Sequence, residues 1–172
     1  SFHVTEVKTS DVIVNGNLNP EIRTMDLGEE NGAKTASVSM AELVANLVES
    51  MTCNKIIQIA GTYTGSDLEG EPLTLSGKVL LPAKGKIKNM VIVSHWTIGA
   101  TRECPSECFP LEGILASKGY AVVMADYIGY GVTANRIHPY MHITSTAGSV
   151  VDMALPVKPY LEAIDRKPES DK

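Results

Sequence analysis

The sequence lacks three features that would point to common classes of partner or compartment. No apolar run in its 172 residues approaches the roughly 20 residues of a membrane-spanning helix, so we expect no membrane span. Lys and Arg never cluster beyond a pair and the formal net charge is −5, which argues against nucleic acid or an anionic membrane as partner. Cysteine is scarce too: Cys53, Cys104 and Cys108 permit one disulfide and define no redox compartment.

What remains is a globular composition, with 44% hydrophobic and 20% charged residues. Residues 89–93 and 120–125 are continuous apolar runs, which predicts two strands of a parallel sheet that are buried on both faces. The apolar residues between them recur at helical spacing, from Pro110 near the start to Gly119 just past the end. The stretch therefore predicts a βαβ unit with a right-handed crossover.

The flanking segments predict further elements. Alternating apolar residues indicate an antiparallel hairpin with strands at 55–64 and 73–81. A capping-box signature at 39–42 opens an amphipathic helix that extends to Met51. A later helix spans 144–164, and we expect it to kink or restart at Pro156, because proline lacks the amide hydrogen.

The first part of the chain carries a weaker pattern. Asn15-Gly16 after an apolar triplet suits a type I′ turn, and Pro20 cuts the return strand short. Residues 1–36 otherwise predict an N-terminal arm or lid-like segment, followed by a single domain over 37–172.

Loops rich in polar residues and glycine follow both strands of the predicted βαβ unit. Their sequences are Ser94-His95-Trp96-Thr97-Ile98-Gly99-Ala100 and Asp126-Tyr127-Ile128-Gly129-Tyr130-Gly131. Open α/β sheets place their sites at the carboxyl ends of their strands, so we expect the functional site where these two loops meet.

At these loops the chain resembles the front half of the α/β-hydrolase-fold lipases and esterases, especially their secreted lipase-like branch. Asp126, Tyr127, Gly129 and Gly131 match the family's Asp-Tyr-x-Gly-x-Gly motif after its fourth strand, and the likeness extends from about Lys55 to the C-terminus. The resemblance implies an incomplete α/β-hydrolase fold, in which an antiparallel first hairpin joins a parallel βαβ unit behind an N-terminal helical arm. It also implies an extracytoplasmic protein.

The same resemblance implies hydrolysis of a small ester or lipid through a serine ester, without a cofactor or metal. No Gly-x-Ser-x-Gly elbow occurs in the sequence, so we expect a fragment whose triad follows Lys172 and which is inactive alone. Thr97 is the best candidate for the oxyanion donor. The residues assigned to the oxyanion hole and pocket wall are His95, Trp96, Thr97, Tyr127, Gly129 and Tyr130.

Alternatives remain open. Trp96 stands where the family usually has glycine, which favours a non-catalytic binding module on a hydrolase-like sheet. A third hypothesis is a thiol or metal protein that uses Cys104, Cys108 and His138. His138 and His142 have the i, i+4 spacing of zinc ligands, but Pro139 between them argues against a helix there.

Two motifs have simpler interpretations. Residues 129–134 fit the dinucleotide fingerprint G-x-G-x-x-A, yet Pro139 leaves no room for the helix that must follow. Asp126 is predicted to accept hydrogen bonds from loop amides rather than to act as a catalytic carboxylate.

Two expectations concern pairing. If any cysteines pair, they are Cys104 and Cys108, with Cys53 left as a buried thiol. The strand at 89–93 suits the middle of a sheet, so its free edge should be paired by a missing remainder of the protein or by another copy.

Overall fold

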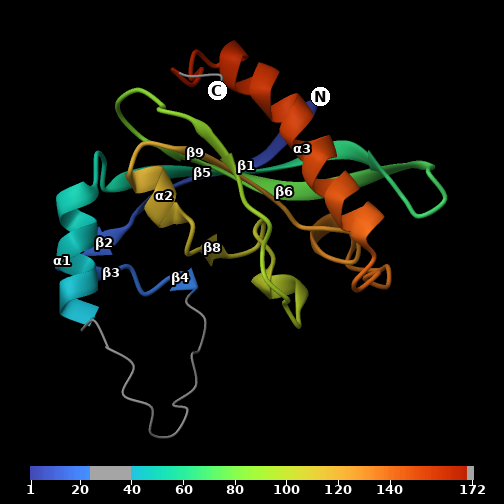
Figure 1. Ribbon diagram of the computed structural model, residues 1–172, viewed down its shortest axis with the longest axis horizontal. Coiled ribbons are helices and arrows are strands. Elements are labelled where there is room, and N and C mark those ends of the chain that lie inside the picture. The colour runs from blue at the N-terminus through green and yellow to red at the C-terminus, as the bar shows by residue number, and fades with distance from the viewer. Residues whose placement is uncertain (24–39, 170–172) are drawn as a thin grey trace, which may run out of the picture.

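A five-stranded mixed sheet in the order β1-β5-β6-β9-β7 organises the chain (Figure 1). The computed structural model describes residues 1–23 and 40–169. Neighbouring strands are antiparallel except for β9 and β7, which are parallel. The strands of this sheet are β1 (Phe2–Asp11), β5 (Lys55–Ser66), β6 (Pro72–Pro82), β9 (Ala121–Ala125) and β7 (Met90–Ile92).

Two small strand pairs flank this sheet. In the first, β2 (Ile13–Val14) and β3 (Asn17–Leu18) form a hairpin. Its turn residues Asn15 and Gly16 have φ of +50° and +76°, which confirms the predicted type I′ turn. In the second pair, β4 (Ile22–Arg23) lies parallel to β8 (Phe109–Pro110).

Helices cover both faces of the sheet. The longest, α3 (Ile143–Ala163), packs on one face and α2 (Gly113–Ser117) on the other, while α1 (Met40–Ser50) lies at the end of the sheet beside β2 and β3 and adds Leu47 to the cluster on the α2 side (Figure 1). Short 3₁₀ turns are η1 (Thr101–Glu103) and η2 (Gly131–Thr133). α1 confirms the predicted amphipathic helix, although Ser39 of its capping box lies outside the described residues.

Strand β9 is buried on both faces, as predicted. Its five residues alternate between the two cores, with Ala121, Val123 and Ala125 toward α3 and Val122 and Met124 toward α2. This double burial makes β9 the central support of the loops that follow it.

Helix α3 continues through Pro156 without restarting. Met153, Val157 and Leu161 recur every fourth residue and are fully buried against the sheet on both sides of this proline. Packing of one continuous face therefore outweighs the local hydrogen bond that proline removes. None of the helices among the described residues has the length and apolar character that a bilayer crossing requires.

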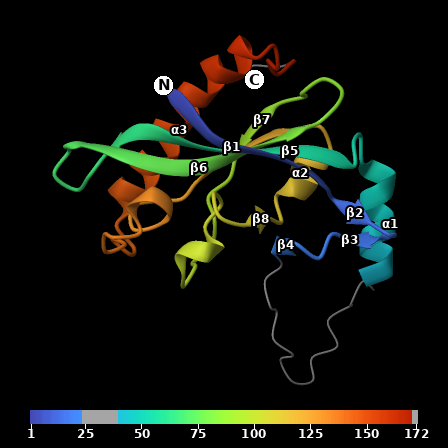
Figure 2. The same cartoon turned by 180° about the vertical axis from the view of Figure 1, so that it is seen from behind.

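The start of the segment predicted as an arm or lid, residues 1–36, is a strand of the sheet. Strand β1 pairs with β5 from Phe2 opposite Tyr63 to Asp11 opposite Lys55, so it forms one edge of the sheet (Figure 2). Only Phe2 and Ser10 of this strand are buried, so backbone pairing rather than an apolar pattern places it there. Residues 24–36 lie outside the described residues, and a domain boundary at 37 stays a prediction.

Candidate functional site

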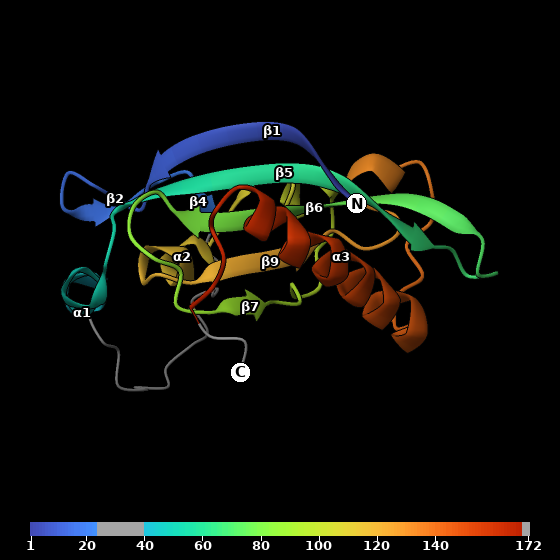
Figure 3. The ribbon, with the colours of Figure 1, turned by 90° about the horizontal axis from the view of Figure 1, so that it is seen from above.

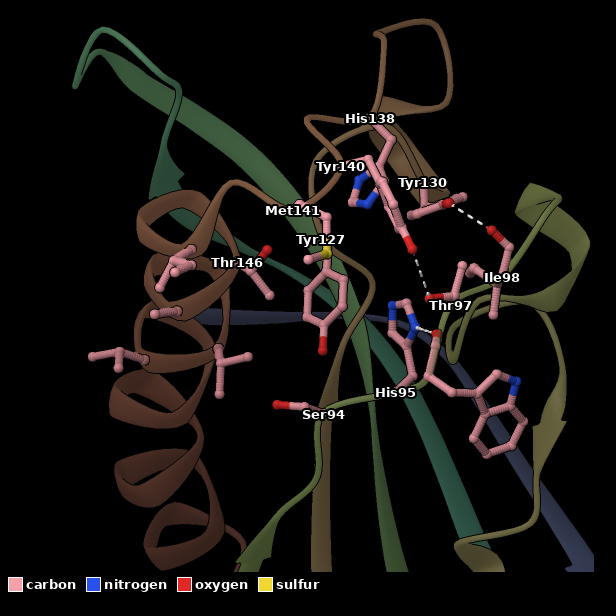
Figure 4. A pocket seen from close by; sticks show the side chains of 15 residues that line it. Ser94, His95, Thr97, Ile98, Tyr127, Tyr130, His138, Tyr140, Met141 and Thr146 are labelled. Carbon is pink, nitrogen blue, oxygen red and sulfur yellow. Dashed lines mark hydrogen bonds between the residues drawn. The ribbon is translucent and has the colours of Figure 1, made fainter.

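The loops after β7 and β9 converge beside the N-terminal half of α3 and enclose a pocket of about 540 Å³ (Figure 4). Five of the six residues assigned to the site from the sequence line it, and Gly129 does not. The lining residues are Ser94, His95, Trp96, Thr97, Ile98, Tyr127, Tyr130, His138, Tyr140, Met141, Ile143, Thr146, Ala147, Val150 and Val151.

One wall of the pocket is aromatic. The rings of His95 and Tyr127 stack with centroids 4.0 Å apart, and those of Tyr130 and His138 lie 4.7 Å apart. The facing wall belongs to α3 and is aliphatic (Figure 4). Asp, Glu, Lys and Arg are all absent from the lining among the described residues. The pocket therefore suits an uncharged group.

His95 joins the two loops. Its Nδ1 lies 2.7 Å from the carbonyl oxygen of Trp96, and its Nε2 lies 3.2 Å from that of Asp126. Both partners are acceptors, and a neutral imidazole has only one N–H, so it can donate to one of them at a time. With both nitrogens facing carbonyl groups and its ring flat on Tyr127, His95 serves as part of the wall rather than as a free base.

Two hydrogen bonds hold the backbone beyond Thr97. The hydroxyl of Tyr130 donates to the carbonyl of Ile98 at 2.9 Å, and the amide of Gly99 donates to Oε2 of Glu103 at 2.8 Å. Thr97 itself is exposed at the pocket, with its hydroxyl 3.5 Å from that of Tyr140 (Figure 4). The segment that contains the candidate oxyanion donor is thus anchored on its C-terminal side.

Asp126 is a structural acceptor. It is fully buried, its Oδ1 accepts the amide hydrogen of Ser106 at 2.9 Å, and its Oδ2 accepts the hydroxyl hydrogen of Ser76 at 2.6 Å. A side chain at Gly131, whose φ is +54°, would overlap both Ser76 and Asp126. These contacts confirm the predicted role and explain the second glycine of the motif.

The first glycine of the motif makes room for a histidine. Gly129 has φ of +93°, and a Cβ there would lie 2.6 Å from the backbone nitrogen of His138. His138 also places Nδ1 2.7 Å from the carbonyl oxygen of Ile128. Gly129 therefore shapes the pocket indirectly, by letting the His138 segment approach.

Tyr127 carries backbone strain at the centre of the site. Its φ of +69° is unusual for a residue with a side chain. Burial raises the pKa of its hydroxyl, an effect that Ser94 and the backbone of His95 partly offset. Ser94 and the backbone of His95 lie near this hydroxyl, but among the described residues none meets the full geometry of a hydrogen bond with it. Strain of this kind is often found at functional sites.

The metal and thiol hypotheses find no support in the geometry. His142 caps α3 by accepting the amide hydrogen of Ser145, and the described residues contain no cluster suited to a metal ion. The three cysteines are free thiols, and Cys53, expected to be buried, is partly exposed between α1 and β5. Burial raises the pKa of Cys108 and, with a smaller effect from Asp126, raises that of Cys104 to about 12, whereas a reactive thiol needs a lowered pKa.

The wall contributed by α3 and the preceding loop was missed at the sequence level. Met141 and Ile143 were assigned no role, Val151 was predicted only as part of the helix at 144–164, and His138 was considered only for a metal or thiol site. The one available signal was that the family resemblance continued through 137–140. The dinucleotide fingerprint at 129–134, in contrast, contains η2, a single 3₁₀ turn, in place of the start of the helix that binds pyrophosphate.

Comparison with solved structures places this geometry among hydrolase folds. A protein from Legionella pneumophila, provisionally assigned as a hydrolase, superposes with a TM-score of 0.61 at 21% identity, over 76% of this chain and 38% of its own. The rice cell wall degrading esterase LipA from Xanthomonas oryzae superposes with a TM-score of 0.58 at 27% identity, over 73% of this chain and 35% of its own. No protein-family model and no curated protein matches the sequence.

These likenesses establish the class of fold. The chain has an α/β fold, in which helices cover the faces of a mixed parallel and antiparallel sheet, arranged as in part of a hydrolase-like fold. It spans little more than a third of the length of the structures it resembles.

Proposed function

We propose that this chain forms part of a serine hydrolase of the carboxylesterase or lipase-like kind, in which it supplies the oxyanion loop and one wall of the substrate pocket. The observation that carries the proposal is the convergence of the two loops, joined by His95, around an uncharged pocket at the carboxyl ends of β7 and β9. The likeness to the esterase LipA supports the same reaction class. In its more specific form, the proposal is that the protein belongs to the secreted, lipase-like branch and is extracytoplasmic.

The backbone N–H of Thr97 is our candidate for the oxyanion donor. It lies in the loop after β7, at the pocket, between the carbonyl of Trp96 that contacts His95 and the carbonyl of Ile98 that accepts from Tyr130. Loss of one such donor typically costs about 3 kcal/mol of transition-state stabilisation. Tyr127 and Tyr130 form the adjoining pocket wall.

The chain itself carries no nucleophile elbow, so we expect the purified 172-residue protein to show no turnover of short acyl esters. Hydrolysis of a chromogenic acetate ester, followed with and without a serine-reactive inhibitor, measures this directly. Inhibitor-sensitive turnover would show that a serine within this chain is activated, and would contradict the assignment of roles given above.

We further propose that the substrate group held by this pocket is uncharged, as in a small ester or a lipid acyl chain. Trp96 is the only tryptophan of the chain and lines the pocket, so its fluorescence reports occupancy. Methyl butyrate should change its emission in a saturable way, whereas butyrate should not, because the lining lacks a cation. Val151→Asp should abolish the response, while Val7→Asp on the far edge of the sheet serves as control. Equal binding of ester and anion would refute the proposed substrate class.

A non-catalytic binding module remains the second candidate, because Trp96 occupies the position of the family's usual glycine. Binding of both ester and parent alcohol with equal effect on Trp96 would favour this alternative. Preference for the ester would favour the hydrolase.

We also propose that the free edge of β7 is paired by a strand from the remainder of a longer protein or from another copy. Glu169, near the end of the described residues, donates its amide hydrogen to the carbonyl of Ile87, three residues before β7, at 2.8 Å. On α3, Ile143, Val151 and Leu155 fall on one stripe and leave 82%, 53% and 68% of their surface exposed. An apolar stripe of this kind is typical of a surface that another polypeptide covers.

A further inference from the structure

Behind the candidate oxyanion loop lies a contact with the N-terminal segment. Nη1 of Arg23 donates to the carbonyl oxygen of Glu103 at 2.7 Å, and its Nη2 lies 3.3 Å from the Oε2 atom of the same residue. That Oε2 atom accepts the amide hydrogen of Gly99. Arg23 thus contacts both the backbone and the side chain of Glu103, and the side chain of Glu103 in turn binds the loop at Gly99.

The same arginine also contacts the start of the loop. Its guanidinium carbon lies 5.6 Å from the ring centroid of Trp96, within the range of a cation–π contact. Arg23 therefore bridges Trp96 and Glu103, and the candidate donor Thr97 lies between them in the chain.

The position of Arg23 is set by the core. Strand β4 places Ile22 opposite Phe109 and Arg23 opposite Pro110 of β8. Ile22 and Phe109 are each 5% exposed and belong to the same hydrophobic cluster. The backbone that carries the guanidinium is consequently anchored independently of the loop that the guanidinium holds.

Burial distinguishes this pair from ordinary surface ion pairs. The side chains of Arg23 and Glu103 are each 25% exposed, against 53% and 60% for Lys8 and Glu21. Because the pair is less exposed, solvent and salt screen the attraction between its charges less, and the planar guanidinium can donate two hydrogen bonds at once.

A small void of about 10 Å³ lies beside the pair. Glu112 also lines it, and the buried Oε2 atom of Glu112 has no partner among the described residues.

We propose that Arg23 and Glu103 act as positioning residues that fix the backbone of residues 96–99, so that the N-terminal segment sets the geometry of the oxyanion loop. We call the contacts of Arg23 with Glu103 and Trp96 the latch. The assignment of that loop as an oxyanion hole rests on the proposed function, whereas the latch is defined by these contacts alone. Catalytic donors must be held to within about 0.5 Å of their productive position, so contacts that fix this backbone matter for the site.

Trp96 fluorescence tests the latch without any enzymatic assay. Arg23→Met keeps the length of the side chain and removes its charge and donors, so the Trp96 emission should shift to the red and become easier to quench with acrylamide, at unchanged far-UV circular dichroism. Arg23→Lys restores the charge but not the fork of donors, and should recover part of the wild-type spectrum. Glu103→Gln keeps an acceptor for Gly99 and should give a smaller shift in the same direction. Lys8→Met, which breaks an exposed pair in the same segment, is the matched control.

Unchanged emission and quenching in Arg23→Met would overturn the proposal, and so would an equal shift in Lys8→Met. If Arg23→Met does not fold, Arg23→Lys and Glu103→Gln decide, because wild-type spectra in both would refute the latch. A working latch in a protein that binds no ester would leave the latch standing and remove the proposed function, so the two failures are distinguishable.

Discussion

The two edges of the sheet are built differently (Figure 3). Strand β1, at one edge, is ten residues long, carries Glu6 and Lys8 in its exposed stretch, and changes register between Val4 and Glu6. Strand β7, at the other edge, has three residues, no charged side chain and no register shift in its pairing with β9. Charges and bulges protect a sheet edge from pairing with other chains, and only β1 has them.

The backbone of β7 makes the contrast sharper. The carbonyl of Asn89 accepts from Ala121 and the amide of Val93 donates to Val123, so both residues bond to β9. In a parallel ladder the residues that bond to one neighbour alternate, which directs the N–H and C=O groups of Met90 and Ile92 toward the free edge. The difference indicates that β1 has the features of an edge strand, whereas β7 has those of a strand in the interior of a sheet.

The strongest test compares one charge placed on each edge. Ile92 and Val7 are β-branched residues with 47% and 60% of their surface exposed, one on β7 and one on β1. We expect the wild-type chain to self-associate with rising concentration, Ile92→Lys to shift it toward monomer, and Val7→Lys to have no effect. Analytical ultracentrifugation measures all three. A wild-type monomer whose β7 amides exchange freely with solvent would show that the two edges are equivalent.

Asp126→Asn should weaken the loops on the β7 side and spare the β1 edge. The amide group cannot accept through both of its atoms, so the Ser106 amide or the Ser76 hydroxyl loses its partner. Leaving one buried group unsatisfied costs about 1–3 kcal/mol. Denaturant unfolding gives the total loss, and hydrogen exchange locates it. A larger increase in exchange rate over wild type in β1 and β5 than in the loops after β7 and β9 would contradict this assignment.

Tyr63→Phe probes the other half of the sheet. The Tyr63 hydroxyl donates to the carbonyl of Ser149 at 2.8 Å and ties α3 to β5. Its removal should lower the free energy of unfolding by about 1 kcal/mol, because the ring stays and one buried hydrogen bond is lost. We expect no change in self-association in this variant. A change there would mean that the two edges are coupled through α3.

The smallest effect is a response to acid on the β7 side. The Gly99 amide, then Arg23, hold the pKa of Glu103 below its ordinary value of 4.5, and Arg102 adds to this. Since the folded pKa is the lower one, the carboxylate stabilises the loop above pH 4.5 and this contribution is lost as pH falls through the lowered value. Trp96 emission should therefore stay constant from neutral pH down to that range and shift below it. Glu103→Gln should abolish the shift, and Glu6→Gln on β1 should keep it. A transition that persists in Glu103→Gln would assign it to another group.

Local patterns in the sequence determined a large share of the fold. The apolar run at 120–125 predicted a strand buried on both faces, the alternation in 55–64 and 73–81 predicted the β5–β6 hairpin, and Asn15-Gly16 predicted the type I′ turn. The sequence also predicted that the loops after these strands lie together, because the carboxyl ends of parallel neighbours in a sheet meet at one edge. Each of these predictions rests on residues adjacent in sequence or on a rule of sheet geometry.

Only the tertiary structure decided the rest. Strand β1 has almost no buried side chain, so no periodicity marked it, and its place depends on the open edge of β5. Arg23 reaches Glu103 across 80 positions of the chain, and α3 closes the pocket with residues that look like any helix surface. Contacts between distant segments depend on how the chain packs as a whole, and the side chains that make them carry no local pattern by which the sequence alone could reveal them.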